Sequence, residues 1–434
     1  MSLLCERDNH QIFIPLLRLQ LRHYVRFGRK VYSRHTPRSM VNLNLVAVQS
    51  MRHLIFLSGE GTMMSGRFGV FSALLVSMAL LSTPTPMAGQ ARTRLAIVGL
   101  DHDHVWGLLK IIADEPDAEL VAIADPHPEL VGKAKAMVPG GVKFFSDYLS
   151  MLDEAKPDAV IVTTANNRHL EILSACAKRK IHFFTEKPMA ASGADAREME
   201  RVAREAGIKL MVNYGNVWPE PTQEAIRRIE AGEIGNIQKI IVEFGHEGPK
   251  EIGTSKYFTE WLYDPVRNGA GALMDFGCYG ADWAMLLKGR PKRVYAASLK
   301  LKTDQHNAVE DDATVLLEYP DATAILMPSW DWSYGKGQAE IFGPKGSFLV
   351  RGDGLLFQPA KGETSAQNPD GKPVETQPVP PEKRNGVAYF LQCIRKNQPI
   401  EGPVSAAINV CVNEIIDAAK ESIRTGRAVA MPAR

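Results

Sequence analysis

Short apolar runs and helical stretches alternate along the chain from residue 93 to residue 214. The strand candidates are RLAIVGL, ELVAIAD, KFFSD, DAVIVTTA, IHFFTEK and KLMVNYG, and stretches such as HVWGLLKIIADE and HLEILSACAKRK separate them. Strands that are joined through helices pair in parallel, because the helix carries the chain back to the edge where the strand began. The alternation predicts an α/β domain with a doubly wound parallel sheet over residues 92–217.

After residue 218 the alternation ends and a period of two takes its place. A helical stretch, TQEAIRRIEAGEIG, precedes the runs IQKIIVEFG, RVYAASLKLK, ATVLLEY, ATAILMPSW and QAEIFGPKGSFLVR. Tight turns such as YPDAT separate some of these runs, which is typical of antiparallel pairing. We predict a second α/β domain with an open, mostly antiparallel sheet over residues 218–384, ending in an exposed loop from residue 359. Two helices are expected in 385–434.

The segment from Met63 has the composition of a signal peptide. It has one basic residue, Arg67, then an apolar core, then prolines and small residues that include Gly89 and Ala91. We predict a signal peptide over 63–91 and a mature chain from about Arg92. A buried helix or an uncleaved membrane anchor is the alternative, although the apolar run is short for a bilayer span. The protein is therefore expected in the periplasm, or in the cytoplasm if this segment is not a functional signal.

Residues 1–62 are basic, with nine Lys and Arg against three Asp and Glu, a net charge of +6. The whole chain carries +2, so the remainder is weakly acidic and a nucleic-acid partner is not expected for it. We interpret residues 1–62 as an upstream extension that is not part of the native protein. A nucleic-acid arm or an organellar presequence is the alternative.

The stretch GLDHDHVWG follows the first strand, where dinucleotide-binding proteins carry G-x-G-x-x-G. Only Gly99 matches, because Asp101 and His104 stand at the second and third glycine positions. A helix N-terminus here can still bind a pyrophosphate through its backbone N–H groups. We expect a shifted pyrophosphate, or side chains that reach the cofactor. A metal site is disfavoured, because no distant Cys or His cluster with matching spacing completes it.

Asp125 follows the second strand, where an acidic residue commonly binds the ribose hydroxyls of a dinucleotide. No arginine follows it closely, which favours NAD over NADP. An Asp in this place is also an ordinary turn or helix-capping residue.

Two further loops follow the fourth and fifth strands, as TTANNRH and TEKP. Both belong at the carboxyl edge of the sheet, where α/β proteins bind ligands. Lys187 in TEKP can place an ammonium beside a hydroxyl oxygen and stabilise the alkoxide that forms when a hydride leaves. A surface lysine on a loop is the alternative.

The motifs of this chain, taken in order, resemble those of one known family. They are GLDHDH, the acid after the second strand, TTANNRH, EKP and GAGALMDFGCYGADW. The family is the glucose-fructose oxidoreductase, inositol dehydrogenase and rhizopine catabolism family (Gfo/Idh/MocA). The resemblance spans nearly all of residues 93–434. Its most specific element is EKP at residues 186–188, together with Asn166 and His169 of the family's T-P-N-x-x-H pattern.

The resemblance implies a Rossmann domain that binds NAD(P), a sugar or polyol substrate that is oxidised at a hydroxyl, and homo-oligomers formed through the sheet of the second domain. Lys187 matches the catalytic lysine and Asp275 the acid of D-x-G-x-H, while Tyr279 stands where most members have a catalytic histidine. A phenol is a weaker base at neutral pH unless a neighbouring lysine lowers its pKa. On one helix, Asp275 and Tyr279 would share a face; alternatively, Asp275 caps a helix and Tyr279 packs between domains.

The candidate residues form three sets. The predicted cofactor-binding residues are Gly99, Asp101, His104, Asp125, Thr164, Asn166, His169, Glu186 and Lys187. The predicted substrate-binding residues are Lys187, Asn216, Trp218, Asp275 and Tyr279, with Trp218 as the stacking residue. The predicted catalytic residues are Lys187, Asp275 and Tyr279.

Two other functions remain open at this point. One is an NAD-dependent glycosidase that oxidises a ring carbon transiently so that the glycosidic bond can be eliminated. The other is a non-catalytic family member that has lost the cofactor, which the missing glycines would explain.

Overall fold

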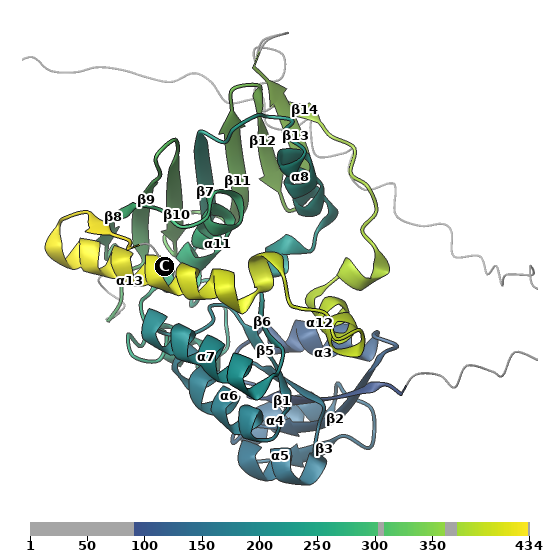
Figure 1. The fold of residues 1–434 in the computed structure, drawn as a ribbon. Helices are drawn as coiled ribbons and strands as arrows, with labels where there is room; N and C mark the ends of the chain where they lie inside the picture. Colours follow the sequence, from purple (N-terminus) through teal and green to yellow (C-terminus); the bar gives the residue numbers. More distant parts are fainter. Residues whose placement is uncertain (1–90, 303–307, 361–370, 433–434) are drawn as a thin grey trace, which may run out of the picture. The chain divides into compact units, whose positions relative to one another are not determined.

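The computed structural model describes residues 91–302, 308–360 and 371–432 (Figure 1). The predicted upstream extension, and all of the predicted signal peptide except its last residue, lie outside these ranges. Among the helices in the described ranges, none combines the length and the apolar character that a membrane span requires.

The first half of the described chain forms a six-stranded parallel sheet with the order β3-β2-β1-β4-β5-β6. Its strands are β1 (Thr93–Val98), β2 (Ala118–Ala124), β3 (Lys143–Phe145), β4 (Ala159–Val162), β5 (His182–Glu186) and β6 (Leu210–Asn213). The helices between them are α3 (Val105–Ala113), α4 (Pro128–Lys135), α5 (Tyr148–Ala155), α6 (His169–Lys178) and α7 (Gly193–Ala206). The strand order reverses between β1 and β4, where doubly wound sheets bind ligands.

The local sequence explains these elements. All four residues of β4, AVIV, are buried, as expected of a central parallel strand that is covered on both faces. Asp147 and Ser192 cap α5 and α7 by accepting hydrogen bonds from the backbone N–H groups of Ser150 and Asp195. The predicted Rossmann sheet is confirmed.

The second half forms a nine-stranded sheet with the order β14-β13-β12-β11-β7-β10-β9-β8-β15. Its strands are β7 (Lys239–Gly245), β8 (Arg293–Leu299), β9 (Asp312–Glu318), β10 (Thr323–Ser329), β11 (Lys336–Gly343), β12 (Gly346–Arg351), β13 (Gly354–Pro359), β14 (Lys372–Pro373) and β15 (Val429–Ala430). Only β7 and β10 pair in parallel, so the predicted mostly antiparallel sheet is confirmed. The sequence did not predict β13, β14 or β15; β14 and β15 are only two residues long.

The helices of the second half are α8 (Glu220–Glu230), α9 (Lys256–Leu262), α10 (Ala272–Asp275), α11 (Gly277–Lys288), α12 (Gly386–Arg395) and α13 (Ala406–Thr425). Helix α11 packs on β7 and β10, and α8 packs on β12 and β13. Helix α13 packs on α7 of the Rossmann half as well as on α11 and β8 (Figure 1). The two sheets therefore share the C-terminal helix as a packing partner.

Candidate active site

The turn after β1 requires a glycine. Gly99 has φ +87°, and a Cβ atom there would lie 2.3 Å from Cγ2 of Thr164 and 2.8 Å from the backbone oxygen of Thr163. The Thr163 hydroxyl also donates a 2.6 Å hydrogen bond to the Gly99 carbonyl. The turn therefore packs directly against the end of β4, at the point where the strand order reverses.

The acid after β2 holds this turn in place. One carboxylate oxygen of Asp125 accepts a 2.6 Å hydrogen bond from the backbone N–H of Leu100. The other accepts a 2.7 Å bond from the backbone N–H of His127 and lies 2.9 Å from Nδ1 of that histidine. The Asp125 side chain is only 1% exposed, so little of its carboxylate is open to a ribose in this arrangement.

Helix α9 of the second half covers the turn. The imidazole of His102 stacks on Phe258 with ring centroids 4.3 Å apart, and the indole N–H of Trp261 donates to the Asp101 carbonyl at 3.2 Å. Burial, and then the charge of Asp125, raise the pKa of Asp101 to about 6. The side chain at the second glycine position is thus enclosed beside another carboxylate.

The loop after β4 contacts the second half of the chain. The side-chain amide of Asn166 donates to the backbone and side-chain oxygens of Asn268 at 3.1 and 2.8 Å, while its own Oδ1 is buried with no partner among the described residues. His169 is buried between the backbone oxygens of Met189 and Thr164 at 3.0 and 3.2 Å, and burial lowers its pKa. Asn166 therefore retains an acceptor for a ligand, whereas His169 joins two loops.

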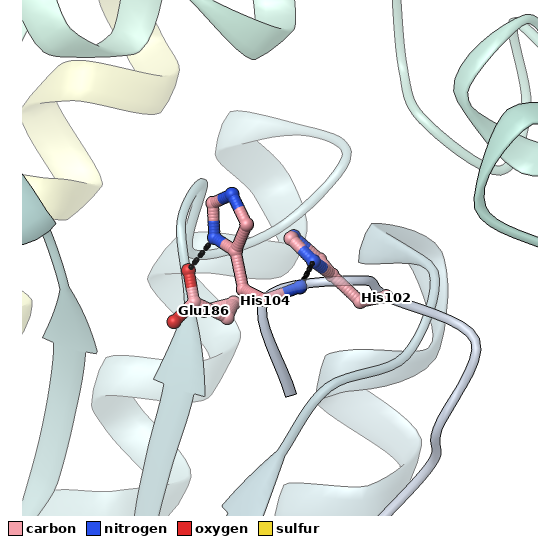
Figure 2. A group of neighbouring side chains, drawn as sticks. All are labelled: His102, His104 and Glu186. Carbon is pink, nitrogen blue, oxygen red and sulfur yellow. Dashed lines mark hydrogen bonds and ion pairs between the residues drawn. The ribbon is translucent and has the colours of Figure 1, made fainter. Parts of the chain in front are cut away.

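Glu186 ends β5 and faces the turn after β1. One carboxylate oxygen lies 2.9 Å from Nδ1 of His104, and the other accepts a 2.8 Å hydrogen bond from the side-chain amide of Asn213. Burial by itself would raise the pKa of Glu186. The contacts with His104 and Asn213 stabilise the charged carboxylate and hold this pKa below its usual range. His102 lies beside them, with its ring centroid 4.4 Å from that of His104 (Figure 2).

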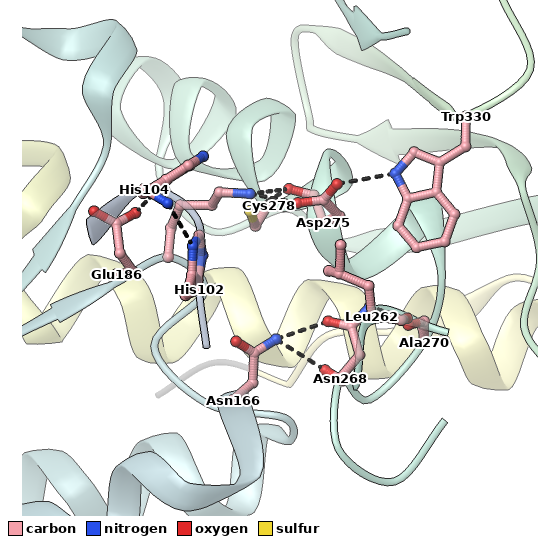
Figure 3. A network of polar contacts seen from close by, with 11 residues as sticks. His102, His104, Asn166, Glu186, Leu262, Asn268, Ala270, Asp275, Cys278 and Trp330 are labelled. Atoms are coloured by element: carbon pink, nitrogen blue, oxygen red, sulfur yellow. Dashed lines mark hydrogen bonds and ion pairs between the residues drawn. The ribbon is translucent and has the colours of Figure 1, made fainter. Parts of the chain in front are cut away.

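Lys187 and Asp275 form a buried ion pair that joins the two halves. The ammonium donates to the Asp275 carboxylate at 2.5 Å and to its backbone oxygen at 3.0 Å. The second carboxylate oxygen accepts a 2.9 Å bond from the indole N–H of Trp330 (Figure 3). Burial disfavours both charges, but each partner stabilises the other, so the pKa of Lys187 is raised and that of Asp275 is lowered. Both groups are therefore charged.

Tyr279 packs beside this pair. Its ring stacks on Phe244 at 4.7 Å and meets the edge of Tyr214 at 5.5 Å, and the Lys187 ammonium lies 5.0 Å from its centre. Burial raises the pKa of Tyr279, and the lysine only partly offsets this effect. The phenol is therefore neutral at neutral pH.

Asp275 and Tyr279 do not share one helix, contrary to the expectation from their spacing. Asp275 is the last residue of α10, and Tyr279 belongs to α11, which begins at Gly277. The side chain of Asp275 does not cap α11 either. Both residues nevertheless lie next to Lys187.

His246 is a candidate that the sequence did not predict. It follows β7, its Nδ1 accepts a 2.9 Å hydrogen bond from the backbone N–H of Gly248, and its ring lies 5.0 Å from that of Phe276. Burial lowers its pKa, although Asp275 acts in the opposite direction. With Nδ1 as acceptor, the neutral imidazole carries its proton on Nε2. A histidine directly after an apolar strand is the signal that could have identified it.

Trp218, one of the predicted substrate residues after β6, is connected to Glu186 through Asn213. The indole N–H of Trp218 donates to Oδ1 of Asn213 at 3.3 Å, and its ring lies 5.5 Å from that of Tyr389. Trp218 also lines a cavity of about 470 Å³. The Oδ1 atom of Asn216 is buried without a partner among the described residues, so it too retains an acceptor.

Two family models match the chain. Residues 93–214 match the oxidoreductase family with an NAD-binding Rossmann fold, and residues 222–349 match the Gfo/Idh/MocA C-terminal domain. Together these matches cover more than half of the sequence. The chain belongs to the Gfo/Idh/MocA family. The predicted family and enzyme class, an NAD(P)-dependent oxidoreductase, are confirmed.

Gfo/Idh/MocA relatives cover most of the described chain. The scyllo-inositol 2-dehydrogenase (NAD(+)) of Bacillus subtilis (strain 168) is 24% identical over 78% of this chain and 96% of its own. The D-apiose dehydrogenase of Paraburkholderia graminis is 26% identical over 76% of this chain and 86% of its own. The crystal structure of aldose-aldose oxidoreductase from Caulobacter crescentus matches with a TM-score of 0.67 at 24% identity, over 78% of this chain and all of that one.

The turn, α3 and the loop after β4 fit the NAD that this Gfo/Idh/MocA fold binds. Gly99 supplies the tight turn, and the backbone N–H groups of His102 and Asp103, just before α3, have no acceptor among the described residues. The unpartnered Oδ1 of Asn166 can accept a hydrogen bond from the cofactor. Asp125 would have to become more exposed to bind a ribose. The individual cofactor contacts stay predictions.

Proposed function

We propose that this protein transfers a hydride between a hydroxyl-bearing carbon of a sugar or polyol and NAD. The observation that carries the proposal is the buried Lys187–Asp275 pair at the end of β5, next to the predicted dinucleotide crevice. The named activities of the scyllo-inositol and D-apiose dehydrogenases support a sugar or polyol substrate.

Lys187 is the electrostatic catalyst in this proposal. Its ammonium is charged and held in place by Asp275, so it can stabilise a substrate oxygen that gains negative charge as the hydride leaves the carbon. Asp275 is fixed in turn by Trp330 and can orient the substrate hydroxyl with the same carboxylate. The pair is therefore organised before the substrate binds.

Tyr279 is the predicted proton acceptor. Because its phenol is neutral, it can donate a proton to a carbonyl oxygen directly, but it must ionise before it accepts one from a hydroxyl. The site thus favours carbonyl reduction near neutral pH, and oxidation should become faster as the pH rises.

NAD is the proposed cofactor rather than NADP. Asp125 directly follows β2, and no arginine follows it closely in the chain. A 2′-phosphate placed there would meet a negative charge, and the residues that follow Asp125 offer no arginine to bind it.

A substrate panel tests the proposal. Full-length protein is incubated with NAD and a range of sugars and polyols, and nicotinamide absorbance is followed. Wild type should turn over at least one of them, and Lys187→Met should lose activity by about 100-fold or more, because a charge-stabilising group is removed. Absence of turnover by wild type, or equal turnover by the variant, contradicts the proposal.

Lys187→Met leaves Asp275 buried and unpaired, which costs about 3–5 kcal/mol of stability. Circular dichroism and thermal melting are therefore measured alongside activity. Lys187→Met/Asp275→Asn restores a neutral pair, so it should melt closer to wild type and still be inactive.

A second candidate is the glycosidase that oxidises a ring carbon transiently. Helix α9 favours this second function, because it packs over the turn after β1 through the contact of Phe258 with His102. Such a cover is expected if the cofactor stays bound throughout catalytic turnover. Release of an aglycone from glycosides without net NADH formation would support this function over simple dehydrogenation.

We also propose that the protein forms homo-oligomers through one face of the nine-stranded sheet. Tyr295, Leu316, Ile325 and Ile241 are consecutive partners across β8, β9, β10 and β7, so they form an apolar row on one face. Tyr295 and Leu316 are exposed large apolar side chains, which is typical of a surface that a partner covers.

Export to the periplasm remains a proposal, based on the segment 63–91. Mass spectrometry of the protein from its native host should give a mature N-terminus near Arg92, and retained dinucleotide would appear in the same native spectrum. An N-terminus upstream of residue 63 would contradict the signal peptide.

A further inference from the structure

We propose that His102, His104 and Glu186 bind a divalent transition metal ion. One ligand atom from each of the three side chains lies within 4.8 Å of the others (Figure 2). The histidines belong to the turn after β1, and the glutamate ends β5, so only the folded sheet brings them together. This site goes beyond the proposed hydride transfer and does not depend on it.

The donor set is typical of zinc. Two imidazoles and one carboxylate leave a fourth position of a tetrahedral ion open for water or a substrate oxygen. Ligand atoms around such an ion lie about 3.4 Å apart, given metal–ligand distances near 2.1 Å. The 2.9 Å contact between His104 and Glu186 would therefore open slightly, and no pair of ligand atoms would have to close by more than about 1.4 Å.

The required movement is small and lies mostly in one side chain. The His104 side chain is 46% exposed, so its ring can rotate toward an ion without breaking core packing. His102 needs to give up only the 3.3 Å contact that its Nδ1 accepts from the backbone N–H of His104. That distance is at the long end for a hydrogen bond, so little is lost.

A second layer of contacts holds the ligands in place, as at known metal sites. Asn213 donates to the Glu186 oxygen that faces away from His104. Phe258 stacks on the His102 ring. Lys187, whose charge acts on His102 and Glu186, is paired with Asp275, which reduces its repulsion of an incoming metal ion.

Zinc binding to full-length protein tests the site. Chelator-treated protein is titrated calorimetrically with Zn²⁺, and bound zinc is measured by mass spectrometry after dialysis. Wild type should bind one more equivalent than Glu186→Gln or His104→Asn, or bind that equivalent at least about 10-fold more tightly. His182→Asn is the matched control, because His182 begins the strand that Glu186 ends; it should bind as wild type does.

Equal zinc binding by wild type and both variants would overturn the proposed site. Zinc that binds only to histidines elsewhere in the chain would give this result. His104 is exposed, so His104→Asn decides the question if Glu186→Gln fails to fold. Mg²⁺ should not compete, because it prefers oxygen ligands. No cofactor or substrate is added, so failure here leaves the proposed hydride transfer untouched.

Discussion

Gly99 shows how one backbone torsion positions the whole crevice. Its left-handed φ, and the atoms that a Cβ would meet at the end of β4, leave no room for a side chain. Gly99→Ala should therefore destabilise the protein by at least about 3 kcal/mol, through a strained φ and a clash with backbone. Urea denaturation measures the change.

Gly107 is the control for that substitution. It ends the same GLDHDHVWG stretch but lies within α3, and a Cβ there would meet nothing within 4 Å. Gly107→Ala should stabilise by about 0.5–1 kcal/mol, because helix propensity improves. Equal changes in stability in the two variants would show that the backbone torsion and the close contacts at Gly99 do not require a glycine there.

The hydroxyl of Tyr279 is a second feature at this scale. Tyr279→Phe keeps the stack on Phe244 and removes only the proton-transfer group, so the melting temperature should stay near that of wild type while turnover falls about 100-fold or more. Oxidation by wild type should rise with pH through the neutral range, since burial raises the pKa of the phenol. The pH profile of the residual activity in the variant should lack this rise.

A flat profile in wild type would contradict the role of the phenol. Turnover of Tyr279→Phe at the wild-type rate would do so as well, and His246 would then be the next proton-transfer candidate to substitute.

Helix α11 carries a buried carboxyl that the proposed reaction does not use. Asp282 is buried, its Oδ1 has no hydrogen-bond partner among the described residues, and burial raises its pKa well above the usual value. The folded state thus binds this proton more tightly than the unfolded chain does. Stability should fall as the pH rises above about 3.9, the unfolded value, toward the folded pKa.

Asp282→Asn removes this dependence, because the amide has nearly the same shape and no charge. We expect a gain of at least about 1 kcal/mol at pH 7 and a flatter dependence on pH, measured by urea denaturation at several pH values. Asp321→Asn, at an exposed ion pair with Lys288, is the control and should change stability by less than about 1 kcal/mol. A loss of stability in Asp282→Asn would show that the carboxylate has a partner.

On the scale of the whole molecule, the exposed row across β8, β9, β10 and β7 makes a prediction about assembly. Leu316 stands in the middle of this row and is 39% exposed. Leu316→Lys should convert the proposed oligomer to monomer, because a charge would be buried at the centre of the contact. Analytical ultracentrifugation measures the state of the full chain.

Lys300→Glu is a control outside that row, with its side chain hydrogen-bonded to the Ala308 carbonyl. It should leave the association state unchanged. A monomeric wild type, or a Leu316→Lys variant that assembles like wild type, would exclude this face as the interface.

The sequence by itself determined both sheets, because hydrophobic periodicity is a local property. It can be recognised in each segment without knowing what that segment packs against. It also marked Lys187, Asp275 and Tyr279, through a family resemblance carried by short motifs. Short elements such as α9 and β15 escaped it, since they depend on what they pack against rather than on their own pattern.

Only the tertiary structure decided how those residues meet. Nothing in the spacing of GLDHDHVWG shows that Glu186, more than eighty residues later, closes on His104, because that contact follows from the order of β1, β4 and β5. The charge states of Lys187 and Tyr279 likewise depend on burial and neighbours, which no local pattern contains. The chain determined which groups are available, and the fold decided which of them act together.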